Sequence, residues 1–159
     1  MIQVGEHLPQ ATFRVNGPDG PMARTTDDVF KGRRIILIGV PGAFTPSCHR
    51  NHLPGFVQHR AEILGKGIDA IAVTSVNDVF VLDAWAKASA AEGIEFLADG
   101  NADFAKAIGL EMDGTGFGLG TRSKRYSMLV EDGVVRILNV EESPSKAEAS
   151  GAEAILKVL

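Results

Sequence analysis

The sequence predicts a domain of the α/β class, built around a mixed β-sheet. Three observations support this. Short apolar runs alternate with segments of helical periodicity between residues 33 and 109, which is the pattern of parallel strands joined by helices. Asp132-Gly133 separates two further strand patterns and is a strong hairpin signal. The length of 159 residues fits one domain, spanning residues 1–159.

Local chemistry defines each element in turn. Residues 11–15 alternate like a short edge strand, residues 16–21 have turn composition, and residues 26–30 favour a brief helix. The remaining predicted elements are a central strand at 33–40, a helix around and after Cys48 interrupted at Pro54-Gly55, a strand at 68–76, a helix at 78–92, a strand at 94–98, a short helix ending near Gly109, strands at 125–130 and 134–140, and a terminal helix opened by a capping-box pattern at 150–153. This order is that of a thioredoxin-like fold with a C-terminal β-hairpin and a terminal helix.

Two further segments are interpreted by their composition. The glycine-dense stretch 113–120 matches no phosphate-binding register, so we predict a plain loop there. The aromatic residues are spaced like core residues, and we assign to the core Phe56, Phe80, Trp85 and Phe96.

Charge and cysteine content narrow the function. The net charge of -4 argues against a nucleic-acid partner, which usually selects a basic face. No apolar run has the length of a membrane span, and the N-terminal residues lack the features of a signal or transit peptide, so we expect a soluble, cytoplasmic protein without a membrane partner. Cys48 is the only cysteine, which excludes an internal disulfide and a CxxC motif. Any redox cycle therefore needs a thiol from outside the chain.

Cys48 lies where a buried strand turns into a helix. Thr45 is a favourable N-cap and Pro46 suits the first helical position, so Cys48 falls in the first helical turn. Free N–H groups and the helix dipole favour negative charge there, and the thiolate is the reactive form of cysteine. A buried structural thiol is the alternative. The carboxyl end of a central strand is where open α/β sheets bind ligands, which favours the reactive interpretation.

Other polar side chains near this turn are weaker candidates. His49, His52 and His59 follow Cys48, but the carboxylate or cysteine that would complete a zinc site is missing nearby, so we predict no metal. We interpret them as surface or packing residues, with His52 near the site. Arg125 opens an apolar strand and has two interpretations: a charge that protects a sheet edge, or a fixed guanidinium near Cys48 that stabilises a thiolate and binds an oxygen substrate.

The stretch Pro41–Cys48 resembles the Pro-x-x-x-Thr-x-x-Cys signature of peroxiredoxins, and together with residues 39–40 and 52–56 it is similar to the peroxiredoxin-five subfamily, which includes the plant type II enzymes. Further matches follow in order along nearly the whole chain, at residues 75–78, 84–85, 97–100, 122–126, 132–133 and 139–141.

This resemblance implies a thioredoxin-fold peroxidase without a cofactor. Its substrates would be hydrogen peroxide and organic hydroperoxides. Cys48 would attack the O–O bond and become a sulfenic acid. Thr45 would hydrogen-bond the peroxide and the thiolate, Pro41 would shield the pocket, and Arg125 would hold both reactants. Because a second cysteine is absent, glutathione with glutaredoxin, or else thioredoxin, would resolve the sulfenic acid. The resemblance also implies a homodimer.

Two alternatives stay open at this point. Cys48 could serve a peroxide sensor or redox-signalling module that is oxidised once without multiple turnover. It could also be an inert thiol in a structural thioredoxin-like protein.

Overall fold

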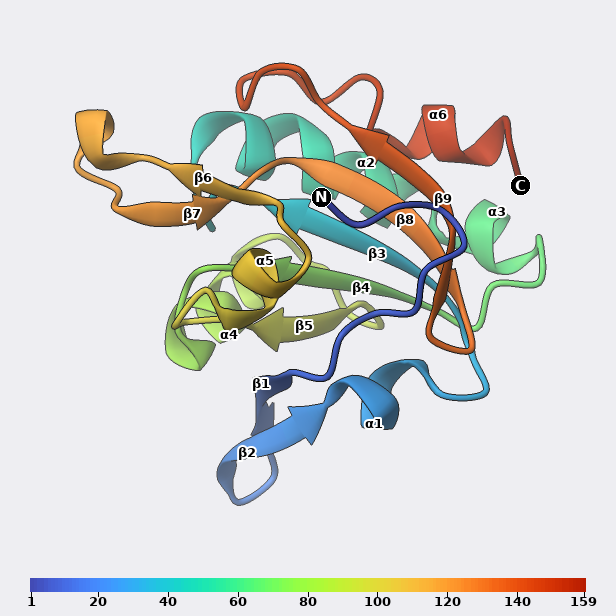
Figure 1. Ribbon diagram of the computed structural model, residues 1–159, viewed down its shortest axis with the longest axis horizontal. Coiled ribbons are helices and arrows are strands. Elements are labelled where there is room, and N and C mark those ends of the chain that lie inside the picture. Colours follow the sequence, from blue (N-terminus) through green and yellow to red (C-terminus); the bar gives the residue numbers. More distant parts are fainter.

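The computed structural model describes all residues from 1 to 159, and its centre is a seven-stranded mixed sheet in the order β2-β1-β5-β4-β3-β8-β9 (Figure 1). Strands β3, β4 and β5 are parallel, whereas β8 runs antiparallel to β3 and β1 runs antiparallel to β5. The strands are β1 Thr12–Gly17, β2 Gly20–Thr25, β3 Arg34–Val40, β4 Ala70–Ser75, β5 Glu95–Ala98, β6 Glu111–Asp113, β7 Thr121–Ser123, β8 Tyr126–Glu131 and β9 Val134–Val140. The helices are α1 Thr26–Phe30, the π turn η1 Cys48–His52, α2 Leu53–Gln58, α3 Arg60–Leu64, α4 Val79–Ala88, α5 Asp103–Ala107, the 3-10 turn η2 Thr115–Phe117 and α6 Ala152–Leu156.

The central sheet is covered on both faces. One apolar cluster lies between the sheet and the helices η1, α2, α3, α4 and α6, and it includes Cys48, Phe56 and Trp85. The other lies between the opposite face and the helices α1 and α5, and it includes Phe13 and Phe104. Strand β3 is buried along nearly its whole length because it contributes alternate side chains to both clusters. This explains the continuous apolar run from Ile35 to Ile38.

Local capping chemistry begins several of the helices. Thr25 and Asp28 form a reciprocal capping box at α1, and Asp78 accepts the N–H of Val81 at the start of α4. At the C-terminal helix the predicted capping box is wrong. The cap position of α6 is Gly151, which makes no side-chain cap bond, and the Ser150 hydroxyl donates instead to Glu141.

The structure corrects three other expectations. The turn expected at residues 16–21 is the connection of a hairpin, because Gly20–Thr25 form strand β2, which pairs with β1. The glycine-dense stretch is part of a two-stranded arm, β6–η2–β7, rather than a plain loop. Phe80 is 69% exposed, because one residue after the inward-facing Val79 the helix has turned about 100° away from the core. Phe56 and Trp85 are fully buried as predicted, and Phe96 is half-buried.

The helix around Cys48 is irregular. Pro46 and Ser47 are already helical, and the N–H of Leu53 then reaches back to the carbonyl of Cys48 in a π turn. The π turn lies directly before Pro54, whose missing N–H leaves the regular ladder one donor short. The predicted interruption near Pro54-Gly55 therefore takes the form of a wider turn on its N-terminal side, and a second break follows at His59.

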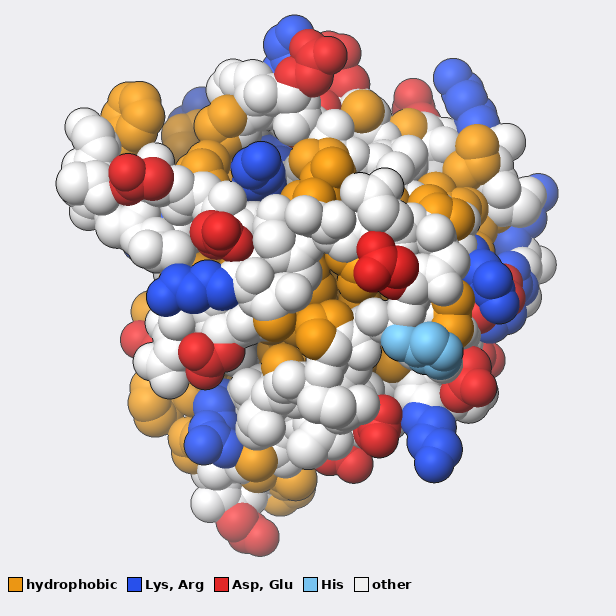
Figure 2. Space-filling view, in the orientation of Figure 1, with side chains coloured by type: hydrophobic (Ala, Val, Ile, Leu, Met, Phe, Trp, Pro, Cys, Tyr) orange, Lys and Arg blue, Asp and Glu red, His pale blue; other side chains and the backbone are white.

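The surface carries charges of both signs. On the face shown in Figure 2, acidic and basic side chains are interspersed rather than gathered by sign. This face therefore has no large field of one sign that would steer a charged partner. None of the helices has both the length and the apolar character that crossing a bilayer requires.

Candidate active site

Cys48 lies in the first turns of the helix that follows strand β3. The loop Pro41–Ser47 connects the two, and Pro41 and Gly42 in it are buried. Phe44 adopts a left-handed backbone conformation with φ of 64°. Such a conformation costs a residue other than glycine on the order of 1–3 kcal/mol, so surrounding contacts must hold the loop in place.

Two polar groups donate hydrogen bonds to the sulfur of Cys48. The Thr45 hydroxyl lies 2.9 Å from Sγ, and Nη2 of Arg125 lies 2.9 Å from the same atom. Arg125 is therefore not an edge charge: it is only 2% exposed and contacts a residue 77 positions away. Its position beside Cys48 is the one that the fixed-guanidinium interpretation expects.

The Thr45 hydroxyl has a choice of acceptors. It lies 2.7 Å from the carbonyl oxygen of Gly42 as well as 2.9 Å from Sγ of Cys48, and it has one proton to give. The carbonyl of Thr45 accepts the N–H of His49, as the predicted N-cap position requires. Its hydroxyl, however, serves the thiol instead of a free helix N–H. This geometry gives Thr45 a polar role at the sulfur that the capping prediction did not include.

Three neutral or anionic acceptors hold Arg125. Besides Cys48, its Nη1 donates to Nδ1 of His52 at 3.0 Å and its Nε donates to the carbonyl of Pro144 at 3.1 Å. No carboxylate forms an ion pair with this guanidinium. A buried charge is costly unless it is paired, so the anionic form of Cys48 is the counter-charge available to Arg125.

Strand pairing places Arg125 at this position. Gly39 of β3 lies opposite Tyr126 of β8, and a Cβ at residue 39 would come within 2.2 Å of the tyrosine ring. Glycine is thus required for the close approach of the two strands at the end nearest the site. The β3–β8 register brings the residue preceding Tyr126 to the sulfur, which local sequence patterns cannot show.

His52 is a buried hydrogen-bond partner of Arg125. It is 1% exposed, its Nδ1 accepts from Arg125, and its Nε2 lies 3.0 Å from the carbonyl of Ser150, so Nε2 carries the proton and donates. Burial, reinforced by the charge of Arg125, lowers the pKa of His52 to about 4, although the Ser150 carbonyl and Glu141 oppose this shift. His52 is therefore neutral at pH 7 and available as an acceptor.

We expect the stability of the protein to fall with acidification because of His52. Its folded-state pKa lies below its ordinary value of 6.5, so the unfolded chain binds more protons than the folded one between about pH 6.5 and pH 4. The contribution of His52 to the free energy of unfolding is therefore fully present above pH 6.5, and about 3 kcal/mol of it is lost as the pH drops to 4. Urea unfolding of the wild type and of His52→Gln across this range measures the effect. His59→Gln, at a half-buried histidine paired with Glu62, is the control, and an equal pH slope in the wild type and His52→Gln would contradict the assignment.

The other candidate residues have separate surroundings. Pro41 is buried at the end of β3, and its carbonyl accepts from Arg122 at 3.3 Å. His49 accepts the indole N–H of Trp85 at 3.1 Å and does not reach Arg125 or the sulfur by any hydrogen bond. His59 pairs with Glu62 on the surface side of the helix. No group of three or more His, Cys, Asp or Glu side chains stands together as a metal site.

The segment 141–151 closes over the site. The carbonyls of Pro144, Ser145 and Ser150 accept from Arg125, Ser47 and His52, respectively. Cys48 is fully buried in this arrangement. Any reactant therefore needs a movement of the surrounding side chains or backbone to reach the sulfur. Sequence reasoning missed these contacts because main-chain carbonyls carry no residue-specific signal.

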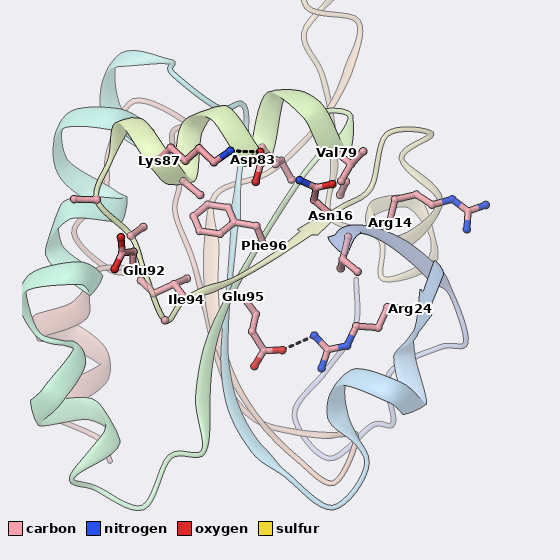
Figure 3. A pocket seen from close by; sticks show the side chains of 17 residues that line it. Arg14, Asn16, Arg24, Val79, Asp83, Lys87, Glu92, Ile94, Glu95 and Phe96 are labelled. Atoms are coloured by element: carbon pink, nitrogen blue, oxygen red, sulfur yellow. Dashed lines mark hydrogen bonds and ion pairs between the residues drawn. The ribbon is translucent and has the colours of Figure 1, made fainter. Parts of the chain in front are cut away.

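One cavity of the protein lies away from Cys48. About 560 Å³ in volume, it lies between the β1–β2 hairpin, α4 and β5, and its lining includes Asn16, Asp83 and Phe96 (Figure 3). None of the four predicted site residues lines it. This cavity is therefore separate from the candidate site around Cys48.

A thioredoxin-like sheet that holds one cysteine against a hydroxyl and a guanidinium defines a thiol-dependent oxidoreductase. Known proteins narrow this class. Residues 3–156 match the Redoxin family. The chain is 46% identical to the chloroplastic peroxiredoxin-2E-2 of Oryza sativa, covering 99% of this chain and 72% of that protein, and 41% identical to peroxiredoxin-2C of the same species, covering 99% and 98%.

Solved structures agree with these relatives. Reduced Prx3 of Vibrio vulnificus in complex with H2O2 superimposes with a TM-score of 0.95 at 47% identity, covering 99% of both chains. Peroxiredoxin 5 of Alvinella pompejana gives a TM-score of 0.86 at 32% identity, covering 99% of this chain and 97% of that one. The chain therefore belongs to the peroxiredoxins, as a single-cysteine member of the peroxiredoxin-five type, and it is a thiol-dependent peroxidase.

Proposed function

We propose that Cys48 is the peroxidatic cysteine, and that Thr45, Arg125 and Pro41 complete the site. The observation that carries this proposal is the pair of donors at 2.9 Å from one sulfur, the only thiol of the chain. The substrates proposed are hydrogen peroxide and organic hydroperoxides. A similar Vibrio vulnificus protein was solved with H2O2, which supports this choice.

In the first step the thiolate of Cys48 attacks the terminal oxygen of the hydroperoxide. The S–O bond forms as the O–O bond breaks, sulfur is oxidised to the sulfenic acid, and the leaving alkoxide or hydroxide takes up a proton to become an alcohol or water. Thr45 can turn its proton to Gly42 and accept the terminal O–H of the peroxide, which aims that oxygen at the sulfur. Arg125 stabilises the charge that moves from sulfur to the leaving oxygen. Pro41 shields the sulfur from water.

In the second step an external thiol reduces the sulfenic acid. One thiol forms a mixed disulfide with Cys48 and releases water, and a second thiol releases the reduced enzyme. We propose glutathione with glutaredoxin as the reductant, and thioredoxin as the second candidate. Because Cys48 is fully buried, its helical turn must open before any thiol reaches it. The π turn there has a hydrogen bond that spans five residues instead of the four of a regular helix, and this irregular turn suits such opening.

Steady-state reduction of H2O2 with glutathione alone, glutathione plus glutaredoxin, or thioredoxin with its reductase tests this choice. We expect multiple turnovers, fastest with glutathione plus glutaredoxin. A faster rate with thioredoxin would reverse the order of the two candidates. Consumption of one equivalent of peroxide per chain, with every reductant in excess, would overturn the turnover cycle and favour the peroxide-sensor alternative.

We further propose a homodimer and a cytoplasmic location. The exposed Phe44, 47% accessible in the loop beside Cys48, supports a protein contact near the site. A cycle that consumes external thiols at each turnover needs a reducing compartment, which supports the cytoplasm. Sedimentation analysis at micromolar concentration tests the first proposal, and a monomeric mass would contradict it.

A further inference from the structure

Arg122 lies on a different element from the four proposed site residues but reaches the same loop. It belongs to β7, in the β6–β7 arm that forms a sheet of its own. Figure 1 shows this arm extending past the carboxyl end of β3. The half-buried guanidinium donates from Nε to the carbonyl of Leu119 at 2.9 Å and from Nη1 to the carbonyl of Pro41 at 3.3 Å. It thus ties the arm to the first residue of the active-site loop.

Gly42 leaves space for the contact between Arg122 and the Pro41 carbonyl. A Cβ added to Gly42 would lie 2.8 Å from Nη1 of Arg122 and 3.1 Å from the Thr45 side chain. Glycine at position 42 is therefore what lets the guanidinium reach the Pro41 carbonyl. Arg122 has no ion-pair partner, so its fixed contacts are with main-chain oxygens alone. An arginine held in this way fixes backbone geometry.

The loop needs anchors from outside because its own conformation is strained. Phe44 has a left-handed backbone, and Gly42 accepts both the N–H and the hydroxyl of Thr45 across this turn. Asn77 anchors the loop from one side by accepting the N–H of Ala43 at 2.9 Å. The bond from Arg122 to Pro41 is the corresponding anchor from the arm. Strained backbone persists only where its surroundings over-determine it.

We propose that Arg122 is a positioning residue for peroxide reduction: it clamps the Pro41–Gly42 backbone and so fixes the Thr45 hydroxyl relative to the sulfur of Cys48. Arg122 itself makes no hydrogen bond to Cys48 or Arg125. Its effect is therefore on the orientation of the peroxide and not on the charge state of the sulfur. This inference rests on the proposed function of Cys48 and Thr45.

The first test compares Arg122→Met with the wild type. We expect the second-order rate constant of the reduced enzyme with H2O2 to fall by about tenfold or more, since displacement of an orienting group by a fraction of an ångström carries such a cost. The rate at which iodoacetamide alkylates Cys48 at pH 7 should stay at the wild-type value, because the contact of Arg125 with the sulfur is intact. Lys124→Met removes a neighbouring exposed cation that forms no ion pair and is the matched control, with an unchanged rate.

Two further variants separate clamping from charge and from folding. Arg122→Lys keeps the charge but cannot bond Leu119 and Pro41 in the same fork geometry, so it should not restore the rate. Adding Gly42→Ala should lower the rate constant of the wild type by a larger factor than that of Arg122→Met. The new methyl group displaces the Arg122 guanidinium, which Arg122→Met no longer has. Circular dichroism and thermal unfolding verify that each variant is folded.

The outcomes distinguish this inference from the function it rests on. Loss of activity in Cys48→Ser with a full rate in Arg122→Met would overturn the clamp alone. A wild-type rate in Arg122→Lys would show that charge suffices and would equally overturn it. A wild-type enzyme that does not consume peroxide would instead overturn the proposed function.

Discussion

Replacing Cys48 with serine is expected to abolish peroxide consumption. A serine hydroxyl stays protonated at neutral pH and has no low-energy oxidation to a product like the sulfenic acid, so neither step of the cycle can occur. The fold should persist, because serine can still accept from Thr45 and Arg125. Peroxide consumption with glutathione and glutaredoxin measures the loss, and circular dichroism checks the fold.

Chemical trapping gives an independent check on the same residue. Dimedone should add to the wild type after one equivalent of peroxide and not to Cys48→Ser, which contains no sulfur able to form a sulfenic acid. Turnover retained by Cys48→Ser would refute the assignment of the nucleophile. Absence of a dimedone adduct in the wild type would favour the inert-thiol alternative.

Replacing Arg125 with methionine is expected to lower the second-order rate constant with peroxide by about 10²- to 10³-fold. Loss of one fixed donor to a developing oxyanion has an effect of this order, and Arg125 also contacts the attacking sulfur. In contrast to Arg122→Met, this variant should also slow the alkylation of Cys48 by iodoacetamide at pH 7, because the sulfur loses its buried cationic donor.

Stability must be measured alongside this rate. Arg125→Met leaves the Pro144 carbonyl and Nδ1 of His52 without their donor, and the unpaired acceptor on the buried His52 costs about 1–3 kcal/mol. Rates should therefore be compared under conditions in which urea unfolding shows both proteins to be folded. Arg136→Met, at a half-exposed arginine of β9 near Glu131, is the matched control and should keep the wild-type rate. A rate within a fewfold of wild type in folded Arg125→Met would exclude Arg125 from the reaction.

Most of the fold could be predicted because its signals are short-range. The parallel strands β3, β4 and β5, the β8–β9 hairpin at Asp132-Gly133 and the helix after Cys48 each follow from periodicity or turn chemistry within a few residues. Strand β2 and the β6–β7 arm were missed for the converse reason. Nearly all of their residues are exposed or only half-buried, so backbone pairing stabilises them rather than an apolar pattern.

In the site, too, contacts between neighbours in the chain could be predicted, whereas contacts between distant residues could not. By itself the sequence determined that the single cysteine, Cys48, stands at a strand-to-helix turn behind Thr45, since these residues are neighbours in the chain. Only the tertiary structure decided that Arg125, 77 residues away, meets this sulfur, and that His52 and the carbonyl of Pro144 hold it there. Local patterns had left Arg125 open between an edge charge and a fixed guanidinium. The deciding factors are the register of β3 against β8 and the return of segment 141–151 over the site, which depend on contacts between distant parts of the chain.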